Sequence, residues 1–204
     1  MSLPRRRFLV LSAGAPVALL AAACSDAPEP GDPSGESGEI PEPDLDALAF
    51  VASLEVAAEA AYRQGLGEMT AGRLGDIPAA GSELFQTAAA QHGQSLAAIN
   101  ELLAGSGRRS TSEADVEFES SVVTPALTAA RVWPELAALA RTLETALSAT
   151  YLQSIHSTLQ SPAALQLAGG IQAVAQKRIA ILNYMLGEYP VPDTFQKTDA
   201  AIAR

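Results

Sequence analysis

The chain has 204 residues, a formal net charge of −10, 5% aromatic residues and one cysteine, Cys24. The length suits one domain with a sizeable core. The acidic balance argues against nucleic acid as a partner, and a single cysteine excludes an intramolecular disulfide.

Residues 1–23 predict a signal peptide, because a basic start precedes an apolar run that ends in small residues. The start resembles the twin-arginine export motif, carried by Arg5, Arg6, Arg7, Phe8 and Leu9. The general secretory route stays open as the alternative.

The letters "LAAAC" at 20–24 resemble the lipobox of bacterial lipoproteins, in which cleavage precedes a lipidated cysteine. We therefore expect lipid attachment at Cys24 and a location on the outer face of the membrane, in the cell envelope. A plain signal peptide or an uncleaved anchor with a chance cysteine is the competing interpretation. The membrane is thus the one partner that the sequence indicates, and a homodimer is possible.

Residues 24–43 are predicted to form a disordered linker that begins with the lipidated cysteine. From 25 to 43 there are six acidic residues, five prolines and no base. Such a segment buries too little apolar surface to order itself. It would connect the lipid to a domain over 44–190.

The first expected helix covers roughly 44–68, with Asp44 as its N-cap. Gly65 and Gly67 mark its fraying end. The second covers roughly 80–104 and stops at "GSGRR". A polar connection follows to about 123, in which "DVEFES" suggests a short extended stretch.

Thr124-Pro125 predicts the start of a third helix that runs to about 159. Pro134 should kink it or split it in two. Ser161-Pro162 repeats the cap signal for a fourth helix that ends near 187. Residues 191–204 are expected to form a C-terminal tail, of which the last ten residues are loosely packed. The fold class is therefore all-α, a four-helix bundle with one long crossover between helices 2 and 3.

Each expected helix carries an ionisable residue at mid-length on its apolar face. These residues are Glu55, His92, Glu144 and Arg178. Buried charges are costly unless they are paired or bound to metal, so we expect the four to meet at one level. "EVAAEAAY" at 55–62 and "ETALSATY" at 144–151 share a frame that begins with Glu and ends with Tyr. Tyr62 and Tyr151 are expected to be core residues that donate hydrogen bonds.

Three segments resemble the ferritin-like domain family, in the group that includes desiccation-related proteins. "DLDALAFVASLEVAAEAAY" is similar to the first helix of that group, "TLETALSATYL" to its third and "LNYMLGEYPVPDTF" to the end of its fourth. The resemblance covers most of 44–195. It implies that the two Glu–Tyr frames occupy equivalent positions in two helix hairpins.

The resemblance also implies a dimetal site with one Glu from each of two helices and Glu-x-x-His from each of the other two. Glu55 and Glu144 match the single acids. The helix 2 motif retains His92 but has Ala89 in place of Glu. The helix 4 motif has Ala175 and Arg178 in place of Glu and His. Three of the six ligands are present.

We therefore expect a degenerate site without metal, in which Arg178 bridges Glu55 and Glu144 and His92 completes the cluster. Two alternatives stay open. The charged groups can lie on a solvated face, or one Fe or Mn ion can bind a residual set made of Glu55, Glu59, His92 and Glu144.

Three functions follow from these alternatives. The first is a non-catalytic structural, binding or stress-related role for a lipid-anchored ferritin-like protein. The second is a metal-binding protein or weak oxidase. The third is an extracytoplasmic lipoprotein that binds a small ligand between its helices. Three absent ligands favour a protein that is not an enzyme.

Overall fold

The computed structural model describes residues 39–203. The predicted signal peptide, the predicted export motif at Arg5, Arg6, Arg7, Phe8 and Leu9, and Cys24 lie outside the described residues. Residues from Gly38 onward form a compact unit by themselves. Within 39–203 every regular element is helical, so the prediction of an all-α bundle is confirmed.

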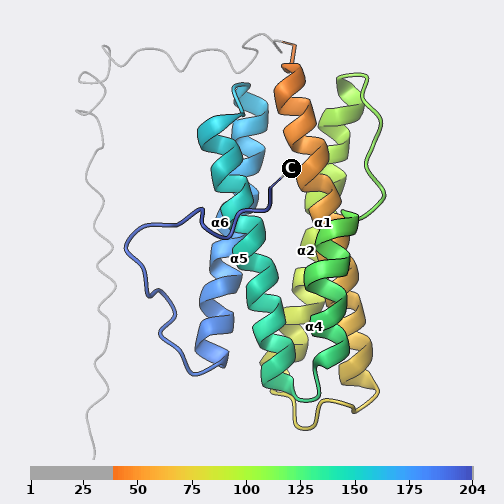
Figure 1. The fold of residues 1–204 in the computed structure, drawn as a ribbon, viewed down its shortest axis with the longest axis vertical. Helices are drawn as coiled ribbons and strands as arrows, with labels where there is room; N and C mark the ends of the chain where they lie inside the picture. The colour runs from red at the N-terminus through yellow and green to blue at the C-terminus, as the bar shows by residue number, and fades with distance from the viewer. Residues whose placement is uncertain (1–38, 204) are drawn as a thin grey trace, which may run out of the picture. The chain divides into compact units, whose positions relative to one another are not determined.

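Four long helices form the bundle and run along one axis (Figure 1). They are α1 (Glu42–Thr70), α2 (Ala79–Gly105), α5 (Trp133–Ser157) and α6 (Pro162–Met185). α1 pairs with α2 and α5 pairs with α6 as two helix hairpins. The hairpins meet where α1 contacts α5 and α2 contacts α6.

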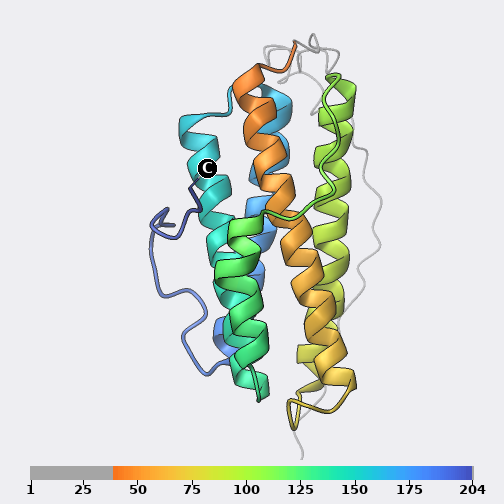
Figure 2. The same cartoon turned by 45° about the vertical axis from the view of Figure 1, so that its right-hand side comes forward.

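The connection between the hairpins, over 106–132, is the long crossover that the sequence predicts. It contains α3 (Val116–Phe118), a π-helical segment η1 (Glu119–Val123) and α4 (Thr124–Ala129). Figure 2 shows α4 alongside the bundle, where it packs against α5. The expectation of an extended stretch in "DVEFES" is wrong, because Asp115 caps this helical segment by accepting the Phe118 N–H at 2.8 Å.

Two predicted N-caps are wrong. Helix α1 begins at Glu42 after Pro41, two residues before Asp44. Asp44 is fully buried and accepts the backbone N–H groups of Gln160 and Ser161 instead. Thr124 is the first residue of α4 and not its N-cap, because the helical backbone continues into it from η1.

The cap at Ser161 is confirmed, since its hydroxyl accepts the Ala164 N–H. Pro134 lies in the first turn of α5, so the predicted third helix is split at this point into α4 and α5. Gly65 does not end α1, which continues to Thr70.

The C-terminal segment is more firmly attached than expected. It lies along the outside of α5 and α6 (Figure 1). The Gln196 side chain donates to Ser148 Oγ at 2.5 Å, and the Ile202 N–H donates to Thr150 Oγ1 at 2.9 Å. Ile202 also packs against the core. The prediction of a loosely packed tail is therefore wrong at these two points.

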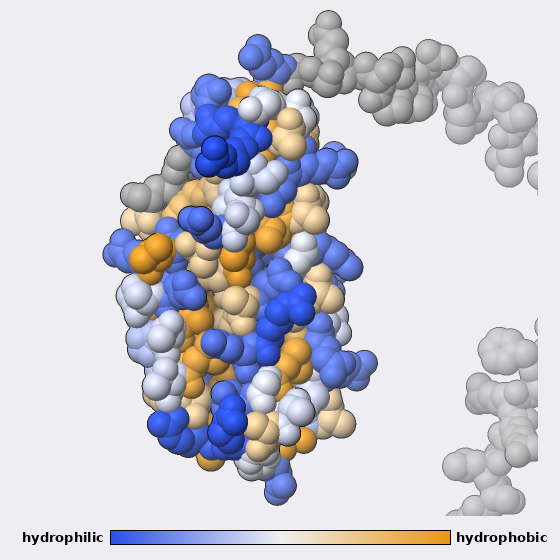
Figure 3. All heavy atoms as spheres, turned by 90° about the vertical axis from the view of Figure 1, so that its right-hand side faces the viewer, coloured by the Kyte–Doolittle hydropathy of each residue, from blue (hydrophilic) through white to orange (hydrophobic). Residues whose placement is uncertain are grey.

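The outer surface is chemically mixed. On the face shown in Figure 3, hydrophobic side chains lie in small groups between hydrophilic ones. None of the helices within 39–203 combines the length and the apolar content needed to cross a membrane.

Candidate functional site: a buried charge cluster at mid-bundle

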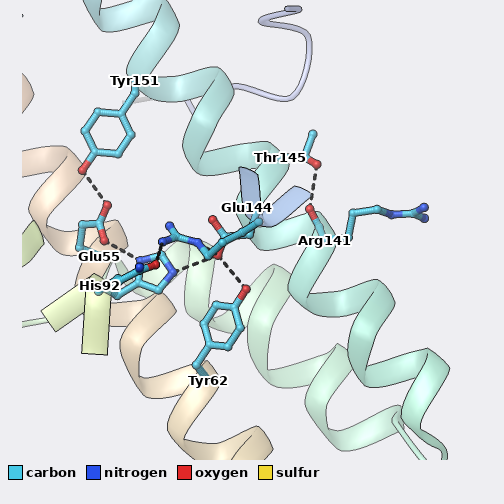
Figure 4. Close-up of polar contacts among 9 residues, drawn as sticks. Glu55, Tyr62, His92, Arg141, Glu144, Thr145 and Tyr151 are labelled. Carbon is cyan, nitrogen blue, oxygen red and sulfur yellow. Dashed lines mark hydrogen bonds and ion pairs between the residues drawn. The ribbon is translucent and has the colours of Figure 1, made fainter. Parts of the chain in front are cut away.

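Four ionisable side chains, one from each long helix, meet inside the bundle. Figure 4 labels three of them, Glu55, His92 and Glu144. Their exposed fractions are 1% for Glu55, 0% for His92, 0% for Glu144 and 5% for Arg178. Each helix places its residue there because the rest of the same face is apolar and packs into one core. The alternative of a solvated face is therefore wrong.

His92 lies between the two carboxylates. Its Nδ1 is 2.6 Å from Glu55 Oε2, and its Nε2 is 3.1 Å from Glu144 Oε1. A neutral imidazole carries one N–H, so donation to both carboxylates requires the imidazolium form. Burial alone lowers the pKa of His92, but Glu55 and Glu144 together raise the pKa to about 9.

Arg178 contacts only one of the two acids by hydrogen bond. Its Nε donates to Glu144 Oε1 at 2.7 Å, and its NH1 group donates to Gln91 Oε1 at 2.8 Å. The expectation that Arg178 bridges Glu55 and Glu144 is wrong. His92 instead lies between the two acids, and the Arg178 guanidinium connects Glu144 to Gln91.

The tyrosines connect the two Glu–Tyr frames crosswise. Tyr62 of α1 donates to Glu144 of α5 at 2.7 Å, and Tyr151 of α5 donates to Glu55 of α1 at 2.7 Å. The expectation that both tyrosines are buried hydrogen-bond donors is confirmed. Burial and the adjacent carboxylate raise the pKa of each tyrosine well above its usual value, so both stay protonated and keep donating.

The cluster is electrically balanced at neutral pH. Two carboxylates face one imidazolium and one guanidinium. Burial alone would raise the pKa of Glu144, but His92 and Arg178 bring that pKa below its ordinary value. Glu144 Oε1 accepts three hydrogen bonds, whereas Oε2 is buried without a hydrogen-bond partner among the described residues.

An aromatic row holds the His92 ring in place. Tyr62 stacks on His92 with ring centroids 5.3 Å apart, Phe85 meets Tyr62 edge-on, and Trp133 meets Phe85 edge-on. Trp133 is thus a buried packing residue. Such contacts between rings add packing energy and fix orientation.

Glu59 lies outside the cluster. Its carboxylate pairs with Arg63 one turn along α1, at 2.6 Å, and its side chain is 21% exposed. His156 is exposed on α5 and lies outside the cluster. Sequence reasoning missed Gln91, which lies directly before His92 and off the apolar face. No spacing signal identifies it.

An all-helical bundle of two hairpins, joined by a long crossover and carrying paired inward carboxylates at mid-height, defines the ferritin-like class of folds. The family model described as ferritin-like domain matches residues 43–188. The chain belongs to this family. No curated protein and no solved structure matches it.

The residues present do not fit the dimetal centre that the family implies. Ala89 and Ala175 are buried and have no donor atom to offer. Both ring nitrogens of His92 already face carboxylates, and Arg178 cannot ligate because it stays protonated. Within residues 39–203, no group of three His, Cys, Asp or Glu side chains is arranged to hold a metal ion.

Proposed function

We propose that this protein is an exported, lipid-anchored member of the ferritin-like family. In it, a cluster of fixed charges occupies the position of the two metal ions. Its role is then structural, ligand-binding or stress-related, without metal-dependent oxidation. Export and anchoring rest on the sequence, through the arginine motif at 5–9 and the lipobox that ends at Cys24.

The position of His92 carries the proposal. A metal ion would need the lone pairs of Glu55 and Glu144 and one lone pair of the imidazole. Instead, both ring nitrogens of His92 contact the acids, and the positive charge of the protonated ring offsets the negative charge of the carboxylates. A second cation, Arg178, completes the neutralisation at Glu144.

Metal binding tests this function. We would purify the chain from residue 25 onward, which retains the compact unit, and incubate it with Fe(II) without oxygen or with Mn(II). The expected result is no stoichiometric metal after gel filtration, measured by elemental analysis. A variant with Ala89→Glu, Ala175→Glu and Arg178→His restores the six-ligand set and serves as the control that should gain metal.

Stoichiometric metal on the unaltered chain, lost in Glu55→Ala, would overturn the proposal. It would favour the second function, a Fe or Mn site built from Glu55, Glu59, His92 and Glu144. Glu59 would first have to leave Arg63 and turn inward.

One observation favours the third function, a lipoprotein that binds a small ligand. A groove of about 730 Å³ lies between α2 and α6, between the charge cluster and the end of the bundle where α1 begins. Its volume falls within the range of small-molecule sites, roughly 300–1,000 Å³.

A further inference from the structure

The groove between α2 and α6 has apolar walls together with five polar lining residues, which are Gln91, Gln94, Ser95, Glu101 and Gln166. Leu102 of α2 and Leu167, Ile171 and Val174 of α6 contribute to its walls. Glu101 is its one charged lining residue. Such a lining suits a long apolar group and disfavours a highly charged ligand.

The groove extends toward the end of the bundle where the described chain begins. It runs along α2 from Gln91 to Leu102, about 16 Å at the helical rise per residue. α1 begins at the same end, because Asp44 binds the turn between α5 and α6 and Glu42 pairs with Arg108 after α2. Any anchor on the preceding residues would therefore connect to the bundle near the outer end of the groove.

The inner end of the groove offers hydrogen-bond donors. Gln91 lines it and accepts the Arg178 NH1 group through its amide oxygen at 2.8 Å. Arg178 has no acceptor, so the oxygen of Gln91 must be the atom that faces it. The amide NH₂ group of Gln91 then remains as a donor, and no residue of the described chain accepts from it in a recorded hydrogen bond.

We propose that this groove binds a free long-chain fatty acid, with its carboxylate at Gln91 and its apolar chain toward the outer end. The charges agree with this orientation. The guanidinium of Arg178 lies behind Gln91, while Glu101 lies almost three turns along α2 from it. The inference rests on the proposed membrane anchoring only for the source of the fatty acid, which is the bilayer.

Two adjacent glycines give a matched pair of variants. A Cβ added at Gly170 or at Gly169 meets no atom within 4 Å, so both positions accept a larger side chain. Gly170 lines the groove and Gly169 does not. Both substitutions replace glycine inside α6, so neither should weaken the helix.

The test is equilibrium dialysis of labelled palmitate against the chain from residue 25 onward. The unaltered chain and Gly169→Phe should each bind one palmitate. Gly170→Phe should bind it at least roughly tenfold more weakly, because fewer methylenes are buried. Gln91→Glu keeps a partner for Arg178 but places a carboxylate against the ligand, so it should also weaken palmitate binding. Octanoate should bind more weakly than palmitate.

Three results would overturn the proposal. The first is no palmitate binding, or equal binding by the two glycine variants. The second is a dimer of the chain that Gly170→Phe disrupts, without palmitate binding, because a second copy would then occupy the groove. The third is a lipidated chain that rejects palmitate while Cys24→Ser binds it, because the acyl chains on Cys24 would then fill the groove.

A failure of the anchoring proposal can be distinguished from a failure of the groove assignment. If mass spectrometry finds no lipid on Cys24 but the chain from residue 25 still binds palmitate in a Gly170-dependent way, the groove assignment stands.

Discussion

Among single residues, Glu144 has the most hydrogen bonds in the cluster. Its Oε1 accepts from Tyr62, His92 and Arg178, and these three donors come from three different helices. A buried carboxylate with so many charged and polar donors is stable as long as all of them remain. Removing one of these donors should therefore lower the free energy of unfolding by more than the loss of a surface ion pair does.

We predict that Arg178→Ala lowers the free energy of unfolding by about 3–5 kcal/mol, because it leaves a buried charge without its cation. Arg141→Ala is the matched control, since Arg141 pairs with Glu188 at the surface. That pair should be worth about 0–1 kcal/mol. Urea unfolding monitored by circular dichroism measures both. Equal, small losses would contradict the buried cluster.

Stability should also depend on pH through His92. Its pKa is about 9 in the folded chain and 6.5 as the ordinary value, so its contribution is fully present below pH 6.5. Above that pH the unfolded chain releases the proton first, and the free energy of unfolding falls as the pH rises through 9. The loss should be about 3 kcal/mol.

The pKa of Glu144 sets the acidic limit of the pH range in which the fold is most stable. Its lowered pKa means that its contribution is present above the ordinary value of 4.5 and is lost as the pH falls through the lowered value. Urea unfolding across the range should therefore show greatest stability near pH 5–6, where both contributions are present. His92→Gln should flatten the alkaline side, and His156→Gln should not. A profile that stays level from neutral pH to beyond pH 9 would contradict the imidazolium.

At the scale of helices, the apolar faces predict which residues are buried but not which of them touch. The faces of α1, α2, α5 and α6 predict Glu55, His92, Glu144 and Arg178 as inward residues, and all four are inward. The partner at each carboxylate depends on side-chain length and on the relative height of the helices. The sequence pattern contains neither quantity, so it predicts the wrong bridging residue.

Helix boundaries show the same limit. Ser161 is identifiable as a cap because its hydroxyl acts on its own helix. Asp44 resembles a cap in sequence, but its carboxylate binds backbone N–H groups 116 and 117 residues further along the chain. A local rule does not anticipate a tertiary contact of this kind.

Packing between α1 and α2 gives a prediction at two nearby glycines. A Cβ at Gly65 would lie 2.7 Å from Phe85, within the aromatic row behind His92, whereas a Cβ at Gly67 meets no atom within 4 Å. Gly65→Ala should destabilise by about 1–3 kcal/mol through overpacking. Gly67→Ala should stabilise by up to about 1 kcal/mol. Thermal unfolding of the two variants checks this, and shifts of the same sign would count against the packing described.

For the whole molecule, the two hairpins place the charge cluster at mid-height and the groove beyond it, toward the end where α1 begins. The crosswise bonds from Tyr62 and Tyr151 join one hairpin to the other. The shared Glu–Tyr frame is therefore a connection between the halves. This role of the frame needs no metal ion.

Anchoring is tested on the full chain. If Cys24 is lipidated, the protein should fractionate with membranes and should need detergent for its release. Metabolic labelling with a radioactive fatty acid should mark the unaltered chain and not Cys24→Ser. An unaltered chain that takes up no labelled fatty acid would contradict the lipid anchor.

The charge state of His92 is the most direct test of the account. In a nitrogen-15-labelled chain from residue 25 onward carrying His156→Gln, His92 is the only histidine, and its ring nitrogens can be observed by NMR. At about pH 7.5 the account predicts that both ring nitrogens are protonated and that they titrate only near pH 9. A neutral ring at this pH, with one nitrogen free to ligate a metal ion, would contradict it.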